Sequence, residues 1–314
     1  MAAATRAPRL LDQVRLRNAG ALSAGEPSYH AARLREAGME EGALVDLIDR
    51  LAGATDGVWQ RELRARGERL GVERPMPWDL ARGASVAMLA PGEAAARLGF
   101  DLATLPIDFV HGARASTEVA GERVRVTAPA GGGRVILHEL GHALLEAHRS
   151  EAGVPPPPVH EGVAELVAGL APLAPGDALA DLRLALARAA FERGLYVDEE
   201  PPDVVYWRCM ERYVCVTCDD ASGAWARLDH IESHPARLAA YAVGAAVAAH
   251  LRTASEGRMG EMIRALATIG ASVPWAAAIG AAAGAPLVVD GVYGADALLA
   301  ELLPAGGVER PPAH

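Results

Sequence analysis

Two histidines and a glutamate near the middle of the chain have the types and the spacing of a metal-dependent hydrolytic site. His138, Glu139 and His142 stand in the pattern H-E-x-x-H. Positions 138 and 142 are one turn apart on one face of a helix, so their imidazoles can bind a single ion. Glu139 lies beside them and can act on a water molecule that the ion carries. Because such a short pattern also matches by chance, the residues around it must support the interpretation.

The residues that follow supply a third ligand of the kind that such a site needs. Residues 143–160 separate His142 from Glu161, and they include Gly153 and four prolines at 155–158. The first helix can therefore end there and a second helix can return beside it. We predict that Glu161 is the third ligand and that Glu165, one turn later, accepts a hydrogen bond from the outer nitrogen of a ligating histidine. Two histidines and one carboxylate, with a fourth position for water, are typical of catalytic zinc.

The segment that contains the motif is apolar enough to form a buried helix, which would hold two ligands rigidly. Its apolar positions are Val135, Ile136, Leu140, Ala143, Leu144 and Leu145. The alternative is a buried helix whose histidines only form hydrogen bonds. A chance match does not explain the apolar helix together with a downstream Glu-x-x-x-Glu, so we favour the metal site.

The composition indicates a globular, mainly helical protein. The chain has 314 residues, of which 51% are hydrophobic, enough to bury a core in one large or two modest domains. Aromatic residues make up only 4%, which favours packed helices over sheets. We predict a mainly α fold with a small edge sheet beside the metal-binding helix. We expect residues 1–104 to be an N-terminal helical part that covers the cleft, and residues 105–314 to be the catalytic part, together forming one continuous domain.

Charge and targeting signals argue against several classes of partner. The net charge of −10 argues against nucleic acid, which needs a positive surface. All thirty basic residues are arginine, which excludes lysine chemistry of the Schiff-base or P-loop kind. The N-terminal residues contain no unbroken apolar stretch of the secretory kind, so we expect a cytoplasmic protein. Residues 265–289 carry no charge, but glycines and prolines interrupt them, and we expect a buried helix with turns rather than a membrane span.

Apolar periodicity predicts where the main elements lie. In the N-terminal part, helices separated by polar, glycine-containing breaks such as residues 52–57 are predicted. These helices are at residues 12–17, 29–51, 58–70 and 78–98. Two short strands are predicted at residues 107–110 and 124–127, where an edge strand could pair with an extended peptide. After the candidate ligands, helices are expected at residues 179–193 and 204–213.

Three cysteines lie close together but do not make a standard metal site. Cys215 and Cys218 form C-x-x-C, and Cys209 precedes them. A structural zinc site usually has four ligands, and the chain has no fourth cysteine. We expect reduced, partly buried thiols; a redox pair and a mixed cysteine and histidine metal site are the alternatives.

Residues 229–251 contain a further candidate. His230 precedes Pro235, which can start a helix, and Tyr241 and Gly244 follow among alanines. A tyrosine on a helix of small residues is usually part of the core, so these residues alone leave its role open.

Together these segments resemble the helical gluzincin peptidases, namely the oligopeptidase, angiotensin-converting-enzyme and carboxypeptidase Taq families. The likeness covers roughly residues 105–300. It lies in His138-Glu-Leu-Gly-His142-Ala, in His160-Glu161-Gly-Val-Ala-Glu165, in His230 and Pro235 before Tyr241-Ala-Val-Gly244, and in residues 270–287.

The resemblance implies a catalytic zinc ion, a peptide substrate, and roles for three further residues. Tyr241 and His230 would stabilise the transition state, and His111, upstream of the zinc helix, would contact a substrate carbonyl. The chain departs from these families in its shorter length and in Leu238 and Ala239, which replace tyrosines common near this motif.

These observations predict a zinc metallopeptidase. Zinc would lower the pKa of its bound water to about 7, and Glu139 would act first as general base and then as general acid. One alternative is a zinc hydrolase or tailoring enzyme that acts on a non-peptide amide, and another is a catalytically silent peptide-binding protein. Endopeptidase and carboxypeptidase cleavage, and the oligomeric state, are left open.

Overall fold

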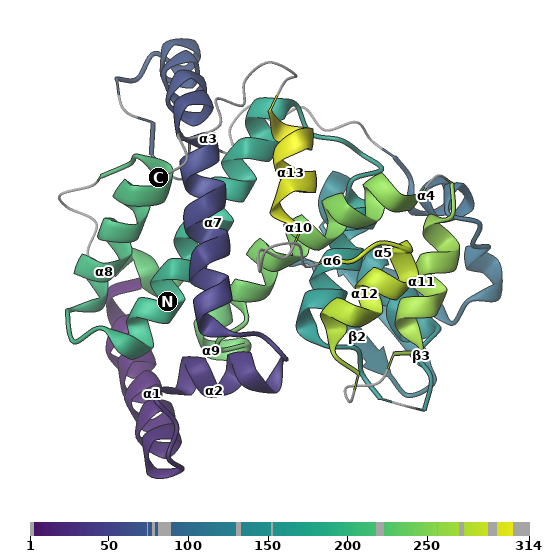
Figure 1. Ribbon diagram of the computed structural model, residues 1–314, viewed down its shortest axis with the longest axis horizontal. Helices are drawn as coiled ribbons and strands as arrows, with labels where there is room; N and C mark the ends of the chain where they lie inside the picture. Colours follow the sequence, from purple (N-terminus) through teal and green to yellow (C-terminus); the bar gives the residue numbers. More distant parts are fainter. Residues whose placement is uncertain are drawn as a thin grey trace. The chain divides into compact units, whose positions relative to one another are not determined.

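The computed structural model confirms the mainly helical class, with one small sheet among the residues that it describes (Figure 1). It describes residues 3–73, 75–76, 79–80, 89–129, 133–151, 153–217, 223–255, 257–269, 273–287 and 294–303. No helix in these ranges is long and apolar enough to cross a membrane.

The chain folds into two compact units, each built from separate stretches of sequence. Unit 1 contains residues 1–83, 175–242 and 302–314, and unit 2 contains residues 84–174 and 243–301. Helix α10 (Leu238–Ser255) begins in unit 1 and continues in unit 2. The division that we expect near residue 104 stays a prediction.

The described elements of unit 1 are all helices or helical turns. Its elements are α1 (Ala3–Ser23), α2 (Tyr29–Glu36), α3 (Glu41–Leu70), α7 (Pro175–Val197), α8 (Pro202–Cys209), the π-helical turn η2 (Met210–Val214), the 3-10 turn η3 (Ala224–Arg227), α9 (His230–Ser233) and the start of α10. A fully buried arginine links α7 to α3: Arg183 of α7 donates to the carbonyl of Ala52 at 2.7 Å and to Thr55 Oγ1 at 3.0 Å. Five donors in a planar fork suit a buried site of this kind.

Helix α3 corrects the predicted break at residues 52–57, because it is continuous from Glu41 to Leu70. The fully buried residues Leu47, Leu51, Thr55 and Trp59 recur every four positions straight through the predicted break. Their burial outweighs the cost of a helical glycine, about 1 kcal/mol relative to alanine. The chain turns earlier instead, between α2 and α3, where Gly38 has a φ of +69°.

A second correction concerns the helix expected at residues 78–98. Among the described residues of this range, α4 at Pro91–Arg97 is helical, whereas residues 79 and 80 lie in a turn. Trp78 and residues 81–88 lie outside the described residues. Pro91 at the first position of the helix is preorganised for such a start.

The described residues of unit 2 form several helices and one small sheet. The helices are α4, α5 (Gly133–Ala147), α6 (Pro157–Ala168), the rest of α10, α11 (Met259–Ala267), α12 (Trp275–Ala283) and α13 (Ala295–Leu302) except its last residue, with a 3-10 turn η1 (Leu102–Thr104). Helix α12 confirms the buried helix expected within residues 265–289, since Trp275 and Ile279 are buried. Residues 270–272 and 288–289 lie outside the described residues.

The sheet has strand order β1-β3-β2. Strands β1 (Ile107–His111) and β3 (Arg123–Ala128) are parallel and confirm the two predicted strands. Strand β2 (Ser116–Ala120) pairs antiparallel with β3 and was not predicted, because its five residues are mostly polar or small. Val124, Val126 and Ala128 are buried on the sheet face that α5 covers. The sheet therefore supports the helix that carries H-E-x-x-H.

Three glycines let α5, α6 and α10 pack at very close range within unit 2. A Cβ atom on Gly141 of α5 would lie 2.5 Å from a backbone atom of α6, and one on Gly162 of α6 would overlap Val247 of α10. A Cβ on Gly244 of α10 would lie 2.7 Å from the Cβ of Glu161. These distances are below van der Waals contact, so larger residues would push the helices apart.

Candidate metal centre

Helices α5 and α6 bring together the three residues that the sequence predicts as metal ligands. His138 and His142 are one turn apart on α5, and Glu161 is on the neighbouring helix α6. Glu161 Oε2 lies 3.4 Å from His138 Nε2 and 3.7 Å from His142 Nε2. One potential ligand atom from each residue lies within 4.8 Å of the others.

The spacing of these atoms fits a tetrahedral zinc ion. Bonds of about 2.0–2.1 Å place the ligand atoms of such an ion roughly 3.3–3.4 Å apart, close to the two measured distances. The side chain of Glu161 is 1% exposed, and a buried carboxylate is costly unless a cation compensates it. The donor set of two imidazoles and one carboxylate also suits zinc.

Glu165 occupies the supporting position that its spacing predicts. Its Oε1 lies 3.0 Å from His138 Nδ1, so the other nitrogen of the ring, Nε2, faces Glu161. The second oxygen of Glu165 pairs with Arg134 of α5. Burial would raise the pKa of Glu165, but the hydrogen bond to His138 and the charge of Arg134 outweigh it and lower that pKa. Glu165 is therefore ionised and fixes the orientation of the His138 ring.

The protonation of His138 reflects the same two carboxylates. Burial lowers its pKa, yet the hydrogen bonds to Glu161 and Glu165 outweigh burial and raise the pKa to about 10. A metal ion bound at His138 would compete with the proton that these carboxylates favour.

Glu139 points toward strand β2, where Thr117 holds it. Thr117 Oγ1 donates to Glu139 Oε2 at 2.7 Å, and it lies 3.0 Å from the backbone oxygen of Glu139. Burial raises the pKa of Glu139, which the Thr117 hydrogen bond and the charge of His138 partly offset. A carboxylate with a raised pKa is suited to accept and return a proton. Sequence reasoning missed Thr117 because it missed β2.

His230 and Tyr241 lie together in unit 1. The candidate metal ligands His138, His142 and Glu161 belong to unit 2. The hydroxyl of Tyr241 lies 2.9 Å from His230 Nε2. Their rings meet edge to face, 5.4 Å apart at an angle of 83°. The sequence pattern thus identified two residues that the fold joins, although eleven positions separate them.

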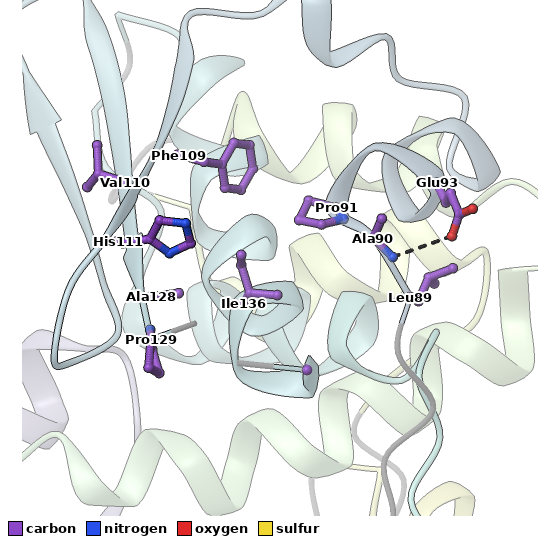
Figure 2. A pocket seen from close by; sticks show the side chains of 11 residues that line it. Leu89, Ala90, Pro91, Glu93, Phe109, Val110, His111, Ala128, Pro129 and Ile136 are labelled. Carbon is purple, nitrogen blue, oxygen red and sulfur yellow. Dashed lines mark hydrogen bonds between the residues drawn. The ribbon is translucent and has the colours of Figure 1, made fainter. Parts of the chain in front are cut away.

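His111 lies at the end of β1 and is exposed. It lines a pocket of about 420 Å³ together with Phe109, Pro91 and Ile136, and Figure 2 shows these side chains around the same space. Ile136 is only half-buried and Val135 is exposed, so the first turn of α5 is less buried than its apolar residues predict. The described residues that line this pocket do not include His138, His142 or Glu161.

The two cysteines that the structure describes, Cys209 and Cys215, are free thiols. Cys209 is buried, and burial raises its pKa to about 11. Cys215 is exposed and unpaired with Cys209. Cys218 lies outside the described residues. In the described part of the chain, neither Cys209 nor Cys215 belongs to a group of three or more side chains that could hold a metal.

Comparisons with known proteins give a fold but no family. No family model matches the chain, and no curated protein matches it. Among solved structures, a carboxypeptidase of family M32 from Deinococcus radiodurans R1 matches with a TM-score of 0.70 and 17% identity, over 94% of this chain and 73% of that chain. PZ peptidase A with an inhibitor matches with a TM-score of 0.70 and 15% identity, over 92% and 62% of the two chains.

A putative oligoendopeptidase F is also similar, with a TM-score of 0.69, 16% identity, and coverage of 94% of this chain and 64% of that chain. This chain thus spans about two thirds of the length of these proteins. At such low identity the likeness shows the fold alone. The chain has the helical fold of these peptidases, as its sequence resemblance led us to expect.

Proposed function

We propose that this protein is a zinc-dependent metallopeptidase. The convergence of His138, His142 and Glu161 carries the proposal, because it unites a catalytic type of zinc ligand set with the Glu139 of H-E-x-x-H. The similarity in fold to peptidases supports a peptide as substrate.

The residues of the chain have distinct roles in the proposed reaction. Zinc bound by His138, His142 and Glu161 would supply a water of lowered pKa, about 7, and polarise the scissile carbonyl. Glu139 removes a proton from the attacking water and passes it to the leaving amine. Thr117 orients the carboxylate of Glu139, which it contacts at 2.7 Å. Glu165 holds the ring of His138.

Tyr241 and His230 are the proposed donors to the oxyanion. The hydroxyl of Tyr241 and Nε2 of His230 lie only 2.9 Å apart, so both can donate to one oxygen when hydrogen bonds to that oxygen replace their mutual hydrogen bond. Gly244 follows Tyr241 by three residues in the same helix, and its backbone lies against Glu161. One donor of this kind typically contributes about 3–4 kcal/mol to stabilising a transition state.

His111 is the proposed contact to the substrate outside the metal centre. Because Phe109, Pro91 and Ile136 share its pocket, the pocket suits an apolar side chain of the peptide, with the imidazole as the polar group at its wall.

A peptide library tests the proposal directly. The zinc-loaded protein is incubated with peptides of graded length, each with a free and an amidated C-terminus, and products are identified by mass spectrometry. We expect cleavage that Glu139→Gln abolishes while zinc binding persists. Loss of cleavage on amidation would identify a carboxypeptidase. A zinc-loaded protein that cleaves no peptide would contradict the proposal, and cleavage of small non-peptide amides alone would favour the other class of hydrolase.

A further inference from the structure

His230 lies in a one-turn helix, and two arginines of helix α1 bind that turn. We call residues 229–233 the His230 turn. Arg6 of α1 donates to Asp229 Oδ1 at 2.5 Å and to Glu232 Oε2 at 3.0 Å. Arg17 of α1 donates to the carbonyl of Ile231 at 2.7 Å and to that of Glu232 at 3.2 Å. A four-residue helix has little stability of its own, so these contacts with a 21-residue helix define its position.

A buried carboxylate of α7 binds the connection between the His230 turn and α10. Glu192 of α7 is fully buried, and its oxygens accept the backbone N–H groups of Ala236 at 2.8 Å and Leu238 at 2.7 Å. Leu238 is the first residue of α10, where a carboxylate stabilises the free N–H groups of the helix. Ala236 has a φ of +62°, a left-handed conformation that a residue with a Cβ keeps only when its surroundings impose it.

Arg17 and Glu192 thus hold opposite ends of the segment that joins His230 to Tyr241. Their charges also interact with each other. Tyr241 is in the first turn of α10, so the start of that helix sets the position of the phenol. The 2.9 Å contact between the two side chains therefore depends on the path of residues 231–238.

We propose that Arg17 and Glu192 are positioning residues that hold His230 and Tyr241 in register as a pair of hydrogen-bond donors. The catalytic part of this inference rests on the proposed peptidase function. The structural part does not, because it concerns the order of residues 229–241 within unit 1. Neither Arg17 nor Glu192 touches the substrate in this scheme; each acts through the backbone that it holds.

The test compares Arg17→Gln with Arg15→Gln, a matched change on the same helix. Arg15 is 71% exposed and pairs with Asp12 of α1 itself at 3.7 Å. Hydrogen exchange of backbone amides is measured by mass spectrometry, together with kcat, KM and zinc affinity. For Arg17→Gln we expect exchange about tenfold faster, confined to residues 229–241. We also expect kcat to be lower by about 10- to 100-fold, as for a misplacement of the order of 1 Å.

KM and zinc affinity should stay unchanged in Arg17→Gln, and Arg15→Gln should match the wild type in every measurement. Arg17→Lys should recover part of kcat, because an ammonium group can still reach one of the two carbonyls. If Arg17→Gln does not fold, Glu192→Gln takes its place. The glutamine oxygen can still accept one of the two backbone N–H groups. Its NH2 group, which is a donor, then faces the other N–H and cannot accept it.

Two results would overturn the inference. One is unchanged exchange in residues 229–241 of a folded variant. The other is faster exchange spread evenly over α1 and α7, which would show that Arg17 only contributes to overall stability. If the wild type cleaves no peptide, the proposed function is wrong, and exchange by itself then decides: faster exchange confined to residues 229–241 supports the positioning role.

Discussion

Replacing Gly244 by alanine should weaken metal binding, although residue 244 contacts no metal. A Cβ atom there would lie 2.7 Å from the Cβ of Glu161 and 2.9 Å from its carbonyl carbon. It would also lie 3.1 Å from the backbone nitrogen of Gly162. Two of these neighbours are backbone atoms of α6, so a change of side-chain rotamer cannot relieve the overlap. Helices α6 and α10 must move apart.

The size of the movement follows from ordinary contact distances. Carbon atoms in contact lie about 3.5–4.0 Å apart, so α6 must retreat by roughly 1 Å. A metal site tolerates ligand displacements of about 0.2 Å, and Glu161 Oε2 now lies only 3.4 Å and 3.7 Å from the two imidazoles. We expect zinc affinity to fall by about 100-fold, the upper end of what changes around the ligands typically cause.

The effect on stability should be smaller than the effect on affinity. Overpacking costs about 1–3 kcal/mol, and alanine recovers about 1 kcal/mol of helix propensity relative to glycine. The metal-free variant should therefore lose roughly 0–2 kcal/mol of unfolding free energy.

Gly92→Ala in α4 is the matched control for Gly244→Ala. It is a helical glycine of unit 2 whose added Cβ would meet nothing within 4 Å. It should leave zinc affinity unchanged and add about 0.5–1 kcal/mol of stability. Zinc affinity is measured by competition with a chromophoric chelator, and stability by denaturation in EDTA. A folded Gly244→Ala protein that binds zinc as tightly as the wild type would refute this account of the helix contact.

Four further predictions concern the metal, the proposed donors, pH and the cysteines. Elemental analysis should find one zinc per chain after purification without chelator or after zinc addition; its absence under both conditions would exclude the metal centre. Tyr241→Phe should lower kcat and kcat/KM about equally, by on the order of 100-fold, with little change in KM; near-normal turnover with a lower Tm would instead assign the residue to the core. Burial raises the pKa of Glu192 to about 7, so between pH 4.5 and 7 the folded state keeps a proton that the unfolded state has lost, and stability falls as pH rises, by on the order of 3 kcal/mol. Denaturation across this range should show that fall in the wild type relative to Glu192→Gln, and parallel curves for the two proteins would contradict it. Cys215→Ser should leave turnover and zinc content unchanged, and a loss of turnover at normal zinc content and stability would give the cysteine a catalytic role.

The sequence by itself determined the features that depend on local spacing. One helical turn separates His138 from His142 and Glu161 from Glu165, so each pair shares a face wherever its helix lies. The strands β1 and β3 could also be predicted from the sequence, because their β-branched residues lie between turn residues. The same reasoning wrongly predicted a break within α3, because the neighbouring sequence does not show that Thr55 and Trp59 are buried.

Only the tertiary structure decided which distant residues support the site. Thr117 reaches Glu139 through a polar strand that has no clear period. Arg17 and Glu192 hold the path from His230 to Tyr241 across long separations in sequence. Gly244 has meaning only beside Glu161, since a glycine inside a helix does not reveal which backbone approaches it. Such contacts arise where separate helices pack, and packing depends on the whole fold rather than on the order of neighbouring residues.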